Sequence, residues 1–349
     1  MDCKRRMLDP MKWIQDKTIL VTGGTGTIGS ELVRQLLAHG PRQVRVFSRD
    51  DTKQYELLES LHEPENLRLL IGDIRDKERL EFALQDVDVV FHAAALKHVP
   101  ICEYNPVEAI ETNIIGSQNV IEASVHNRVK KVIAISTDKA ANPTNIIGMT
   151  KLFMEKLFIN ANYTRGATKT LFSCVRFGNV TWSRGSVLPL WKEQIRESKC
   201  IKISNPVMTR FLMSQTQAIH LTMQAMEIAH GGEIFILKMP SIALGDLAEL
   251  FLKKYYPNGN IQKENTGVRA GEKLHEELID FASSHNYTSV YENDSMFVLI
   301  PNPNAFHIGS SFYKVKGSER GYPECRKATL PERYSSEDHI DIPQIEKVI

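Results

Sequence analysis

Short apolar runs rich in β-branched residues alternate along this chain with stretches of helical periodicity. The apolar runs lie at residues 17–23, 43–49, 67–73, 87–95, 130–137, 171–180 and 232–238. The helical stretches between them include residues 27–40, 106–126, 148–161 and 215–230. Such alternation is typical of βαβ crossovers, which build a parallel sheet covered by helices on both faces. The pattern therefore predicts an α/β fold with a doubly wound parallel sheet.

The pattern is less regular in two segments, residues 181–205 and most of 239–349, which are richer in Pro, Asn and aromatic residues. We expect these segments to form a smaller, discontinuous lobe over the carboxyl edge of the sheet. The predicted division is a nucleotide-binding domain of residues 1–180 and 206–238. Residues 181–205 and 239–349 then form a substrate-binding lobe and a C-terminal tail.

Composition and charge narrow the class of protein. The chain has 349 residues, 42% of them hydrophobic, which is enough for a sizeable core. Lys and Arg number 43 against 42 Asp and Glu, so nothing favours a nucleic-acid or membrane-surface partner. The five cysteines are scattered without a C-x-x-C pair, which predicts reduced thiols and no metal site. No apolar run approaches the roughly 18 residues of a membrane span, so we expect a soluble cytoplasmic protein.

A glycine motif follows the first apolar run and opens the first helical stretch. The sequence GGTGTIGS at 23–30 places Gly23, Gly26 and Gly29 three residues apart. Glycines at such a junction let the backbone approach a pyrophosphate, which then lies on the positive end of the helix. In this strand-to-helix context an ordinary glycine turn is the weaker interpretation. The motif predicts a Rossmann-type dinucleotide site that includes Gly23, Thr25, Gly26, Thr27, Ile28 and Gly29.

The second apolar run ends in FSRD, which bears on the choice of cofactor. Arg49 lies where a site that prefers NAD places an acidic residue for the ribose hydroxyls, and Ser48 before it is also expected to contact the cofactor. A guanidinium suits a 2′-phosphate instead, so the sequence favours NADP. The alternative is that Arg49 is an ordinary solvated surface residue.

Several longer motifs identify a family. They are ALKHVP at 95–100, STDKA at 136–140 with NPTN and a lysine after it, RFGNV and SRGSV within 176–187, MTRF at 208–211, and GEKLHEEL at 271–278. Together with the wide glycine spacing, they resemble the extended short-chain dehydrogenases/reductases. Within that group they resemble the bacterial UDP-N-acetylglucosamine 4,6-dehydratases, which supply sugars for flagellin and surface polysaccharides. The resemblance spans roughly residues 15–280.

The resemblance implies a reaction and a pair of reacting groups. NADP takes a hydride from C4 of the sugar, the new ketone makes the C5 proton acidic, water leaves from C5 and C6, and the hydride returns to C6. Lys139 is then the C5 base, with a lowered pKa, and Asp138 is the acid, with a raised pKa. Thr137 bonds the C4 oxygen, and Lys151 contacts the nicotinamide ribose. A surface ion pair is the alternative for Asp138 and Lys139.

The same resemblance implies further contacts. On the cofactor side these are Asp73 and Ile74 near the adenine, the small residues Ala93, Ala94 and Ala95, and Asn113, which interrupts a helix. On the substrate side they are Lys97 and His98 near the sugar, Asn179 and Arg210 on the diphosphate, Arg269 and Glu272 near the uridine ribose, and Ser186 and Val187. For these residues the alternatives are packing sites, surface amides and ordinary salt bridges.

Position 147 departs from the superfamily pattern. Most members carry a Tyr-x-x-x-Lys pair, which would place a tyrosine at 147, but the residue there is Ile147. Longer, membrane-attached 4,6-dehydratases resemble this chain, have methionine at the position, and are active. We therefore expect Asp138, Lys139, Thr137 or an ordered water to take the C4 hydroxyl proton. We also expect the product to retain its configuration at C5, as in those relatives.

The leading prediction is an NADP-dependent 4,6-dehydratase that acts on UDP-N-acetylglucosamine as a homo-oligomer without a metal. Alternatives within the enzymes are a C5-inverting dehydratase, a variant that stops at a 5,6-unsaturated sugar, and a nucleotide-sugar epimerase. An alternative from another class is a non-catalytic NADP-binding sensor, which Ile147 permits. The Asp138 and Lys139 pair argues against the sensor.

Overall fold

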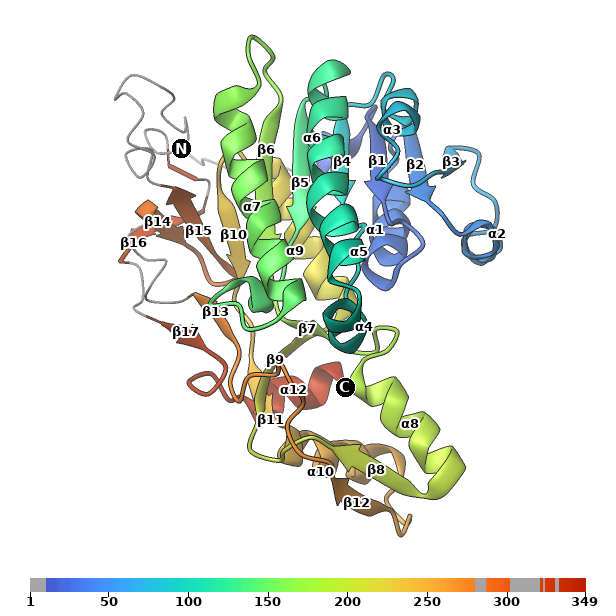
Figure 1. The fold of residues 1–349 in the computed structure, drawn as a ribbon, viewed down its shortest axis with the longest axis vertical. Helices are drawn as coiled ribbons and strands as arrows, with labels where there is room; N and C mark the ends of the chain where they lie inside the picture. Colours follow the sequence, from blue (N-terminus) through green and yellow to red (C-terminus); the bar gives the residue numbers. More distant parts are fainter. Residues whose placement is uncertain (1–10, 280–286, 302–320, 323, 330–332) are drawn as a thin grey trace, which may run out of the picture.

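The computed structural model describes residues 11–279, 287–301, 321–322, 324–329 and 333–349. In this part of the chain a large sheet with its helices forms one lobe, and a smaller lobe lies below the ends of the strands (Figure 1). No described helix is both long and apolar enough to cross a bilayer.

The large sheet is built around seven parallel strands in the spatial order β3-β2-β1-β4-β5-β6-β10. Their bounds are β1 Thr18–Thr22, β2 Gln43–Ser48, β3 Leu67–Ile71, β4 Val89–His92, β5 Lys131–Ile135, β6 Leu171–Arg176 and β10 Ile234–Leu237. Each strand lies in one of the predicted apolar runs. The order reverses between β1 and β4, the point at which doubly wound sheets bind their ligands. The predicted Rossmann-type fold is confirmed.

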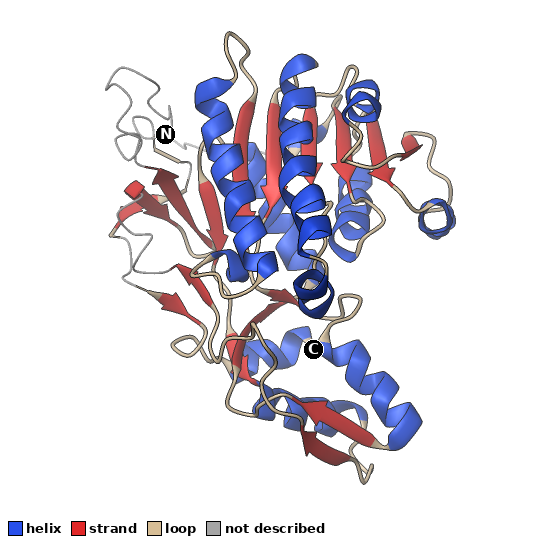
Figure 2. Ribbon diagram, in the orientation of Figure 1, coloured by secondary structure: helices blue, strands red, loops and turns tan. Residues whose placement is uncertain are grey.

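Helices cover both faces of this sheet (Figure 2). One layer contains α3 (Lys77–Ala83), α6 (Gly116–His126) and α7 (Ile146–Thr164), and the other contains α1 (Thr27–Ala38) and α9 (Gln215–Ile228). Helix α2 (Asp51–Ser60) lies by the β3 edge. The predicted helix over 106–126 is α5 (Pro106–Ile110), a π-helical segment η2 (Glu111–Ile115) and α6 in succession. A short helix, α4 (Val99–Tyr104), precedes it.

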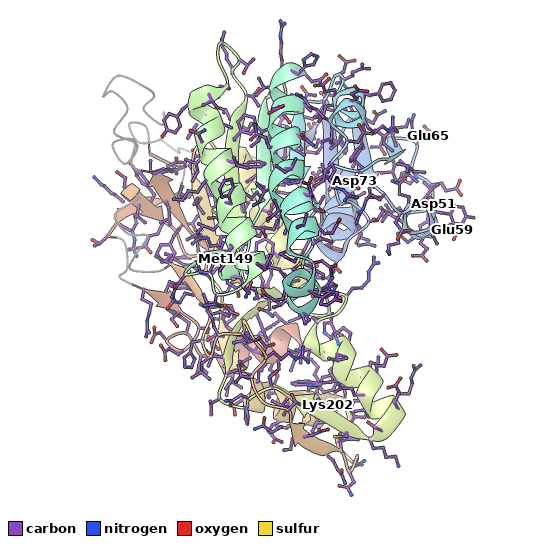
Figure 3. The ribbon with its side chains drawn as sticks, viewed as in Figure 1. Asp51, Glu59, Glu65, Asp73, Met149 and Lys202 are labelled. Atoms are coloured by element: carbon purple, nitrogen blue, oxygen red, sulfur yellow. The ribbon has the colours of Figure 1, made fainter. Side chains whose placement is uncertain are left out.

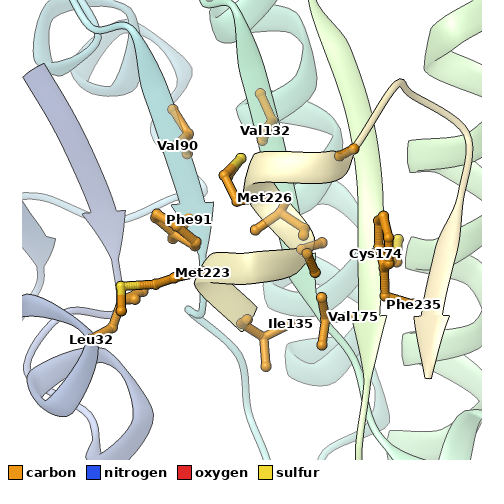
Figure 4. Close-up of a cluster of buried hydrophobic side chains, with 14 of the residues drawn as sticks. Leu32, Val90, Phe91, Val132, Ile135, Cys174, Val175, Met223, Met226 and Phe235 are labelled. Atoms are coloured by element: carbon orange, nitrogen blue, oxygen red, sulfur yellow. The ribbon is translucent and has the colours of Figure 1, made fainter. Parts of the chain in front are cut away.

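Side chains from both layers pack on the sheet. On the α9 side, Met223 and Met226 lie against Phe91 and Val132 of the central strands, with Leu32 of α1 beside them (Figure 4). All five side chains are at most 1% exposed. This dry packing fixes the central strands and hence the positions of the loops at their carboxyl ends.

Antiparallel strands extend the sheet beyond β10. They are β15 (Met296–Pro301), β14 (Tyr287–Glu292) and β16 (Arg326–Ala328). The predicted division placed all of 239–349 in the smaller lobe and its tail, whereas these three strands belong to the large sheet. Strand β15 pairs with β10, β14 pairs with β15, and β16 pairs with β14, and the local composition gave no sign of these long-range pairings.

The smaller lobe has a core of its own. Its helices are α8 (Val187–Ser198), α10 (Leu244–Tyr255) and α12 (Ile342–Val348), and its strands are β7 (Asn179–Val180), β8 (Cys200–Ile203), β9 (Thr209–Met213), β11 (Ser241–Ala243) and β12 (Gln262–Asn265). Trp191, Phe251 and Ile345 are fully buried in this core. Strand β9 lies between β7 and β11, so residues 209–213 belong to the smaller lobe although they were predicted to lie in the nucleotide domain.

Candidate active site

The turn after β1 is so tight that only glycine fits at two of its positions. Gly23 has a φ of 65°, and a Cβ there would lie 2.7 Å from the Ala94 Cα. A Cβ on Gly29 would lie 2.2 Å from the Gly23 carbonyl oxygen. Helix α1 begins at Thr27 without a side-chain cap on its first N–H groups. Those N–H groups are therefore available to an anion, as a dinucleotide pyrophosphate requires.

The predicted ribose end contains a cluster of charges. Arg49 Nη1 lies 3.4 Å from Asp73 Oδ2, and Arg75 Nη2 lies 2.8 Å from the same oxygen. Burial raises the pKa of Asp73, but the hydrogen bonds from Arg75 and the charges of both arginines outweigh it and lower the pKa. Ser48 is buried and accepts hydrogen bonds from Gln54 through its carbonyl and its hydroxyl. Arg49 is half-exposed, so it is accessible to a ligand.

Asn113 is buried and hydrogen-bonded to the loop after β4, so it is not the surface amide that was the alternative. It lies in the π-helical segment and is 1% exposed. Its Oδ1 accepts from the Leu96 N–H at 2.8 Å, and its Nδ2 donates to the Leu96 carbonyl at 3.1 Å and to Thr150 Oγ1 at 3.0 Å. These bonds fix the strand-end loop that contains the half-buried residues Ala93, Ala94 and Ala95. Ile74 is buried against Gly116 at the start of α6. That Asn113, Ile74 and the alanines contact the cofactor remains a prediction.

The predicted acid and base lie together directly after β5. Asp138 and Lys139 form a short 3-10 turn, η3 (Asp138–Ala140), and Lys139 Nζ lies 3.0 Å from Asp138 Oδ1. Thr137 caps this turn and donates its hydroxyl to the same oxygen at 2.9 Å. Asp138 is fully buried, and its Oδ2 has no hydrogen-bond partner among the described residues. A surface ion pair is thus excluded, and one carboxylate oxygen is left for a ligand.

The lysine does not have the lowered pKa that was predicted. Burial alone would lower the pKa of Lys139, but the negative charges of Asp138 and Glu276 outweigh it and raise the pKa. Glu276 Oε1 lies 3.4 Å from Lys139 Nζ. The two carboxylates therefore favour the charged form of Lys139.

A buried ion pair supports this strand end from behind. Glu155 of α7 and Arg176 of β6 are at most 2% exposed and lie 2.6 Å apart through Oε2 and Nη2. Ser136, just before Thr137, donates to Glu155 Oε1 at 2.5 Å. Arg176 also donates to the Leu278 carbonyl at 2.8 Å, which ties β6 to β13 (Glu277–Ile279).

Lys151 and Ile147 both lie on the buried side of α7. Lys151 is 7% exposed, and its ammonium donates to the Ile135 carbonyl at 2.8 Å. Burial lowers the pKa of Lys151 to about 8. Ile147 is 4% exposed and packs with Cys102 and Ala109 in a small separate apolar cluster. Its surroundings in this cluster are therefore those of a core position.

Two of the predicted substrate residues have unpartnered polar atoms. Asn179 Oδ1 and Ser186 Oγ are buried and have no hydrogen-bond partner within the described part of the chain. Asn179 lies in β7, Ser186 is the N-cap of α8, and Val187 is the first residue of that helix. Like Asp138 Oδ2, both atoms could accept a hydrogen bond from a water or a ligand, and their contact with the substrate remains a prediction.

Arg210 has contacts that the sequence did not suggest. It is 9% exposed, and its guanidinium donates to the carbonyls of Thr209, Lys273 and Leu274 at 2.7, 3.0 and 3.2 Å. These bonds attach Arg210 to the segment that precedes Glu276. Contact between Arg210 and the diphosphate remains a prediction, which these hydrogen bonds do not favour.

The two other predicted contacts from this segment lie nearer to solvent. Arg269 is exposed, and its backbone N–H donates to the half-buried Glu272 at 3.2 Å. Their contact with the uridine ribose remains a prediction.

A loop of the smaller lobe bridges to the cofactor side. Arg184 donates from Nη2 to the Thr25 carbonyl at 2.9 Å, and its N–H donates to Thr27 Oγ1 at 3.1 Å. Lys97 Nζ donates to the Arg184 carbonyl at 2.9 Å. The His98 ring lies against Gly185, where a Cβ would approach it within 2.7 Å. Lys97 and His98 are therefore linked to the SRGSV loop, and their predicted contact with the sugar is untested.

Sequence reasoning missed two residues of this site. GEKLHEEL contains three glutamates, of which only Glu272 was predicted to contact a ligand, and the run itself does not distinguish Glu276 from Glu277. Arg184 lies inside SRGSV, where a basic residue next to a glycine was the only local signal.

Comparison with known proteins places the chain in a family. Residues 19–298 match the family described as polysaccharide biosynthesis protein. An uncharacterized membrane protein of Methanocaldococcus jannaschii is 51% identical over 84% of this chain and 88% of its own. A UDP-N-acetylglucosamine 4,6-dehydratase (inverting) of Campylobacter jejuni is 46% identical over 82% and 83%. A UDP-glucose 4-epimerase of Rickettsia bellii is 43% identical over 76% and 78%.

A solved structure agrees with these relatives. The structure of Pen from Bacillus thuringiensis aligns with a TM-score of 0.84 at 43% identity, over 96% of each chain. The family match covers residues 19–298, which include the glycine turn and the Asp138 and Lys139 turn, and the relatives cover most of the chain. The chain therefore belongs to the polysaccharide biosynthesis protein family of short-chain dehydrogenase/reductase fold, with UDP-N-acetylglucosamine 4,6-dehydratases among its relatives, as its motifs predicted.

Proposed function

We propose that this chain is an NADP-dependent UDP-N-acetylglucosamine 4,6-dehydratase. The observation that carries the proposal is the Asp138 and Lys139 pair at the carboxyl end of β5, with Asp138 Oδ2 buried and unpartnered. An elimination needs an acid and a base side by side, and this pair supplies both. The C. jejuni relative named for this reaction supports the substrate.

The residues on the cofactor side fit a dinucleotide. Gly23 and Gly29 leave space where a Cβ would clash, and the uncapped start of α1 faces that space. Arg49 supports NADP, because its half-exposed guanidinium suits a 2′-phosphate. When bound, the nicotinamide would accept the C4 hydride and return it to C6.

The chain's own groups balance the protons of the reaction. With Ile147 in place of a tyrosine, Asp138 Oδ2 takes the proton of the C4 hydroxyl and later gives it to the departing C6 hydroxyl, which leaves as water. Thr137 orients this carboxylate through its 2.9 Å hydrogen bond. Neutral Lys139 takes the C5 proton and returns it after the hydride reaches C6. Each group ends the cycle in the state in which it began.

This sequence of transfers has a stereochemical consequence. If Lys139 removes and returns the C5 proton from one side of the ring, C5 keeps its configuration. The names of the C. jejuni relatives state inversion, which favours the opposite outcome. Reaction in deuterated water, followed by NMR of the ring couplings of the first product, decides between them. A product with the L configuration would contradict retention.

One incubation separates the candidate functions. Purified protein is incubated with UDP-N-acetylglucosamine and NADP, and the product is followed by mass spectrometry and proton NMR. A 4,6-dehydratase gives a 4-keto sugar with the mass lowered by one water. The 5,6-unsaturated product has the same mass but shows alkene signals and no ketone. An epimerase, which the R. bellii relative supports, leaves the mass unchanged, and a sensor gives no reaction.

A homo-oligomer is part of the proposal. Large apolar side chains are exposed on the neighbouring helices α4, α5 and α7, and Figure 3 labels one of them, Met149. Exposed apolar patches of this kind mark protein interfaces. We call this set the helical apolar patch, and it consists of Ile101, Tyr104, Val107, Ile110, Met149 and Phe153.

The cytoplasmic location remains a prediction, and the name of the M. jannaschii relative, a membrane protein, does not favour it. Fractionation of cells that express the full chain tests it.

A further inference from the structure

Glu276 is a buried carboxylate that faces the predicted base from the smaller lobe. Its side chain is 3% exposed, and its Oε1 lies 3.4 Å from Lys139 Nζ. Its Oε2 is buried and has no hydrogen-bond partner in the described part of the chain. The backbone around it is fixed, because the Glu276 N–H donates to Ser336 Oγ at 2.9 Å and its carbonyl accepts from the Ser336 N–H at 2.8 Å.

The charges around Lys139 come from three elements. Asp138 lies on η3 at 3.0 Å, Glu276 precedes β13, and Arg210 of β9 has its Nε 3.9 Å from Glu276 Oε1. The adjacent His275 is directed elsewhere, with Nδ1 bonded to Thr209 and Nε2 3.5 Å from Glu337. One ammonium is thus held by two carboxylates, and one of these has a second cation beside it.

This arrangement conflicts with the use of Lys139 as a base. A charged lysine cannot take the C5 proton, and the two carboxylates favour the charge. The conflict is reduced when Asp138 takes the C4 hydroxyl proton, because one of the two negative charges then disappears. Bound substrate also excludes water, which brings a neutral amine and carboxylic acid closer in energy to the ion pair. Lys139 then needs an acceptor for its own proton.

We propose, on the basis of the proposed function, that Glu276 accepts this proton and so converts Lys139 into the free base. The proton moves from Lys139 Nζ to Glu276 Oε1, across the 3.4 Å contact, and leaves a neutral amine and a neutral carboxylic acid. Lys139 takes the C5 proton and later returns it to C5. Glu276 finally returns its proton to Lys139. No outside oxidant, reductant or base is required.

The test is a pH–rate comparison of wild type and Glu276→Gln in a single turnover. The glutamine keeps the shape but cannot accept the proton. We expect C4 oxidation, seen as reduced nicotinamide absorbance, to persist, while water elimination near pH 7 falls by about a hundredfold or more. Elimination in the variant should recover as the pH rises, because Lys139 can then lose its proton to solvent before the substrate binds and excludes water. The wild type should lack this steep dependence.

Two further variants separate proton transfer from a structural role. Glu276→Asp keeps the carboxylic acid and should keep the wild-type shape of the pH profile at a reduced rate; it also carries the test if the glutamine variant fails to fold. Glu277→Gln is the matched control, since its carboxylate is on β13 near Arg333 and should leave both rate and profile unchanged. Thermal unfolding verifies that each variant is folded.

The outcomes are distinct. An equal loss at every pH in Glu276→Gln, or no loss at all, would overturn the inference, because either result means that Glu276 does not exchange a proton with Lys139. Failure of the wild type to dehydrate UDP-N-acetylglucosamine would instead refute the proposed function.

Discussion

The guanidinium of Arg49 lies 3.4 Å from the carboxylate of Asp73, across the carboxyl ends of β2 and β3. This contact holds Arg49 where the adenosine ribose of a bound dinucleotide is expected. A charge-assisted contact with a 2′-phosphate contributes about 1.5–3 kcal/mol. We therefore expect Arg49→Ala to weaken NADP binding roughly tenfold or more, and NAD binding little, as measured by calorimetry.

A matched control for this prediction is Arg68→Ala. Arg68 lies on β3, and its guanidinium donates to the carbonyls of Glu65 and Leu67. Its removal should leave both affinities unchanged. Equal losses for NADP and NAD in Arg49→Ala would show that Arg49 does not discriminate between the cofactors.

Removal of the proposed acid should lower turnover without weakening substrate binding. Asp138→Asn keeps the shape of a fully buried side chain and removes its proton transfers. We expect turnover to fall by about a hundredfold or more, with UDP binding nearly intact. Lys139→Ala should have a similar effect on turnover. It should also lower the Tm, because Asp138 then loses its 3.0 Å cation partner.

Steady-state kinetics and UDP titration measure both quantities. Lys156→Ala is a suitable control, because Lys156 is exposed on α7. Near-normal turnover in both site variants would show that the η3 turn has no part in the chemistry.

The local features of this site were predictable, and the long-range ones were not. The glycine turn, the η3 turn and Lys151 each depend on a strand or helix and the residues beside it, so a short stretch of sequence indicates them. Glu276 reaches Lys139 from 137 positions away in the numbering, through the pairing of β13 and the bonds of Arg210 and Ser336. Nothing in GEKLHEEL shows which glutamate turns inward.

The ionisation states of the buried lysines could not be predicted from the sequence either. A lowered pKa was predicted for Lys139 from burial or a nearby positive charge, but the charges of Asp138 and Glu276 outweigh burial and raise the pKa. Conversely, no described carboxylate forms an ion pair with Lys151, so burial outweighs the more distant charge of Glu155 and the pKa falls. The balance between burial and charge depends on tertiary contacts, which residue type does not reveal.

The pKa of Lys151 makes stability depend on pH. In the folded protein the pKa is about 8, whereas in the unfolded chain it is about 10.4. Between these values the unfolded state binds more protons, so stability rises with pH through this window. Below pH 8 the folded state bears the full cost of the buried charge, roughly 3 kcal/mol. We expect the Tm of wild type relative to Lys151→Met to rise from pH 8 to about pH 10.

Differential scanning calorimetry of the cofactor-free protein measures this dependence. The exposed Lys156 on the same helix provides the control Lys156→Met, whose Tm relative to wild type should stay constant with pH. A constant difference for Lys151→Met as well would mean that Lys151 titrates in the same range in the folded and unfolded states.

The helical apolar patch predicts a change of oligomeric state on substitution. Tyr104 is 88% exposed, so Tyr104→Asp should leave the fold intact and place a charge in the interface. We expect sedimentation velocity to show a smaller species for this variant than for wild type. Tyr55→Asp, at a residue 60% exposed on α2, is the control and should not alter the size. A monomeric wild type would refute the proposed homo-oligomer.

Restoring the missing tyrosine should not improve the enzyme. Ile147 is 4% exposed and packs with Cys102 and Ala109, so Ile147→Tyr places a bulkier aromatic side chain among buried residues. Overpacking of this kind costs about 1–3 kcal/mol. In the proposed mechanism Asp138 Oδ2, which is buried and unpartnered among the described residues, accepts the C4 proton, so a phenol at position 147 has no step to take over. We expect a lower Tm and a turnover that is equal to or below that of wild type.

The comparison with Ile147→Val isolates the effect of the phenol. Valine removes one methylene and should lower the Tm by less than tyrosine does, with turnover close to wild type. If the C4 hydroxyl proton leaves by a route that does not involve position 147, neither variant affects oxidation of the C4 hydroxyl. The single-turnover rate of nicotinamide reduction should then stay within a few-fold of wild type in both variants. A large increase of that rate in Ile147→Tyr would show that the wild-type site lacks an efficient acceptor, and Asp138 would lose its proposed first role.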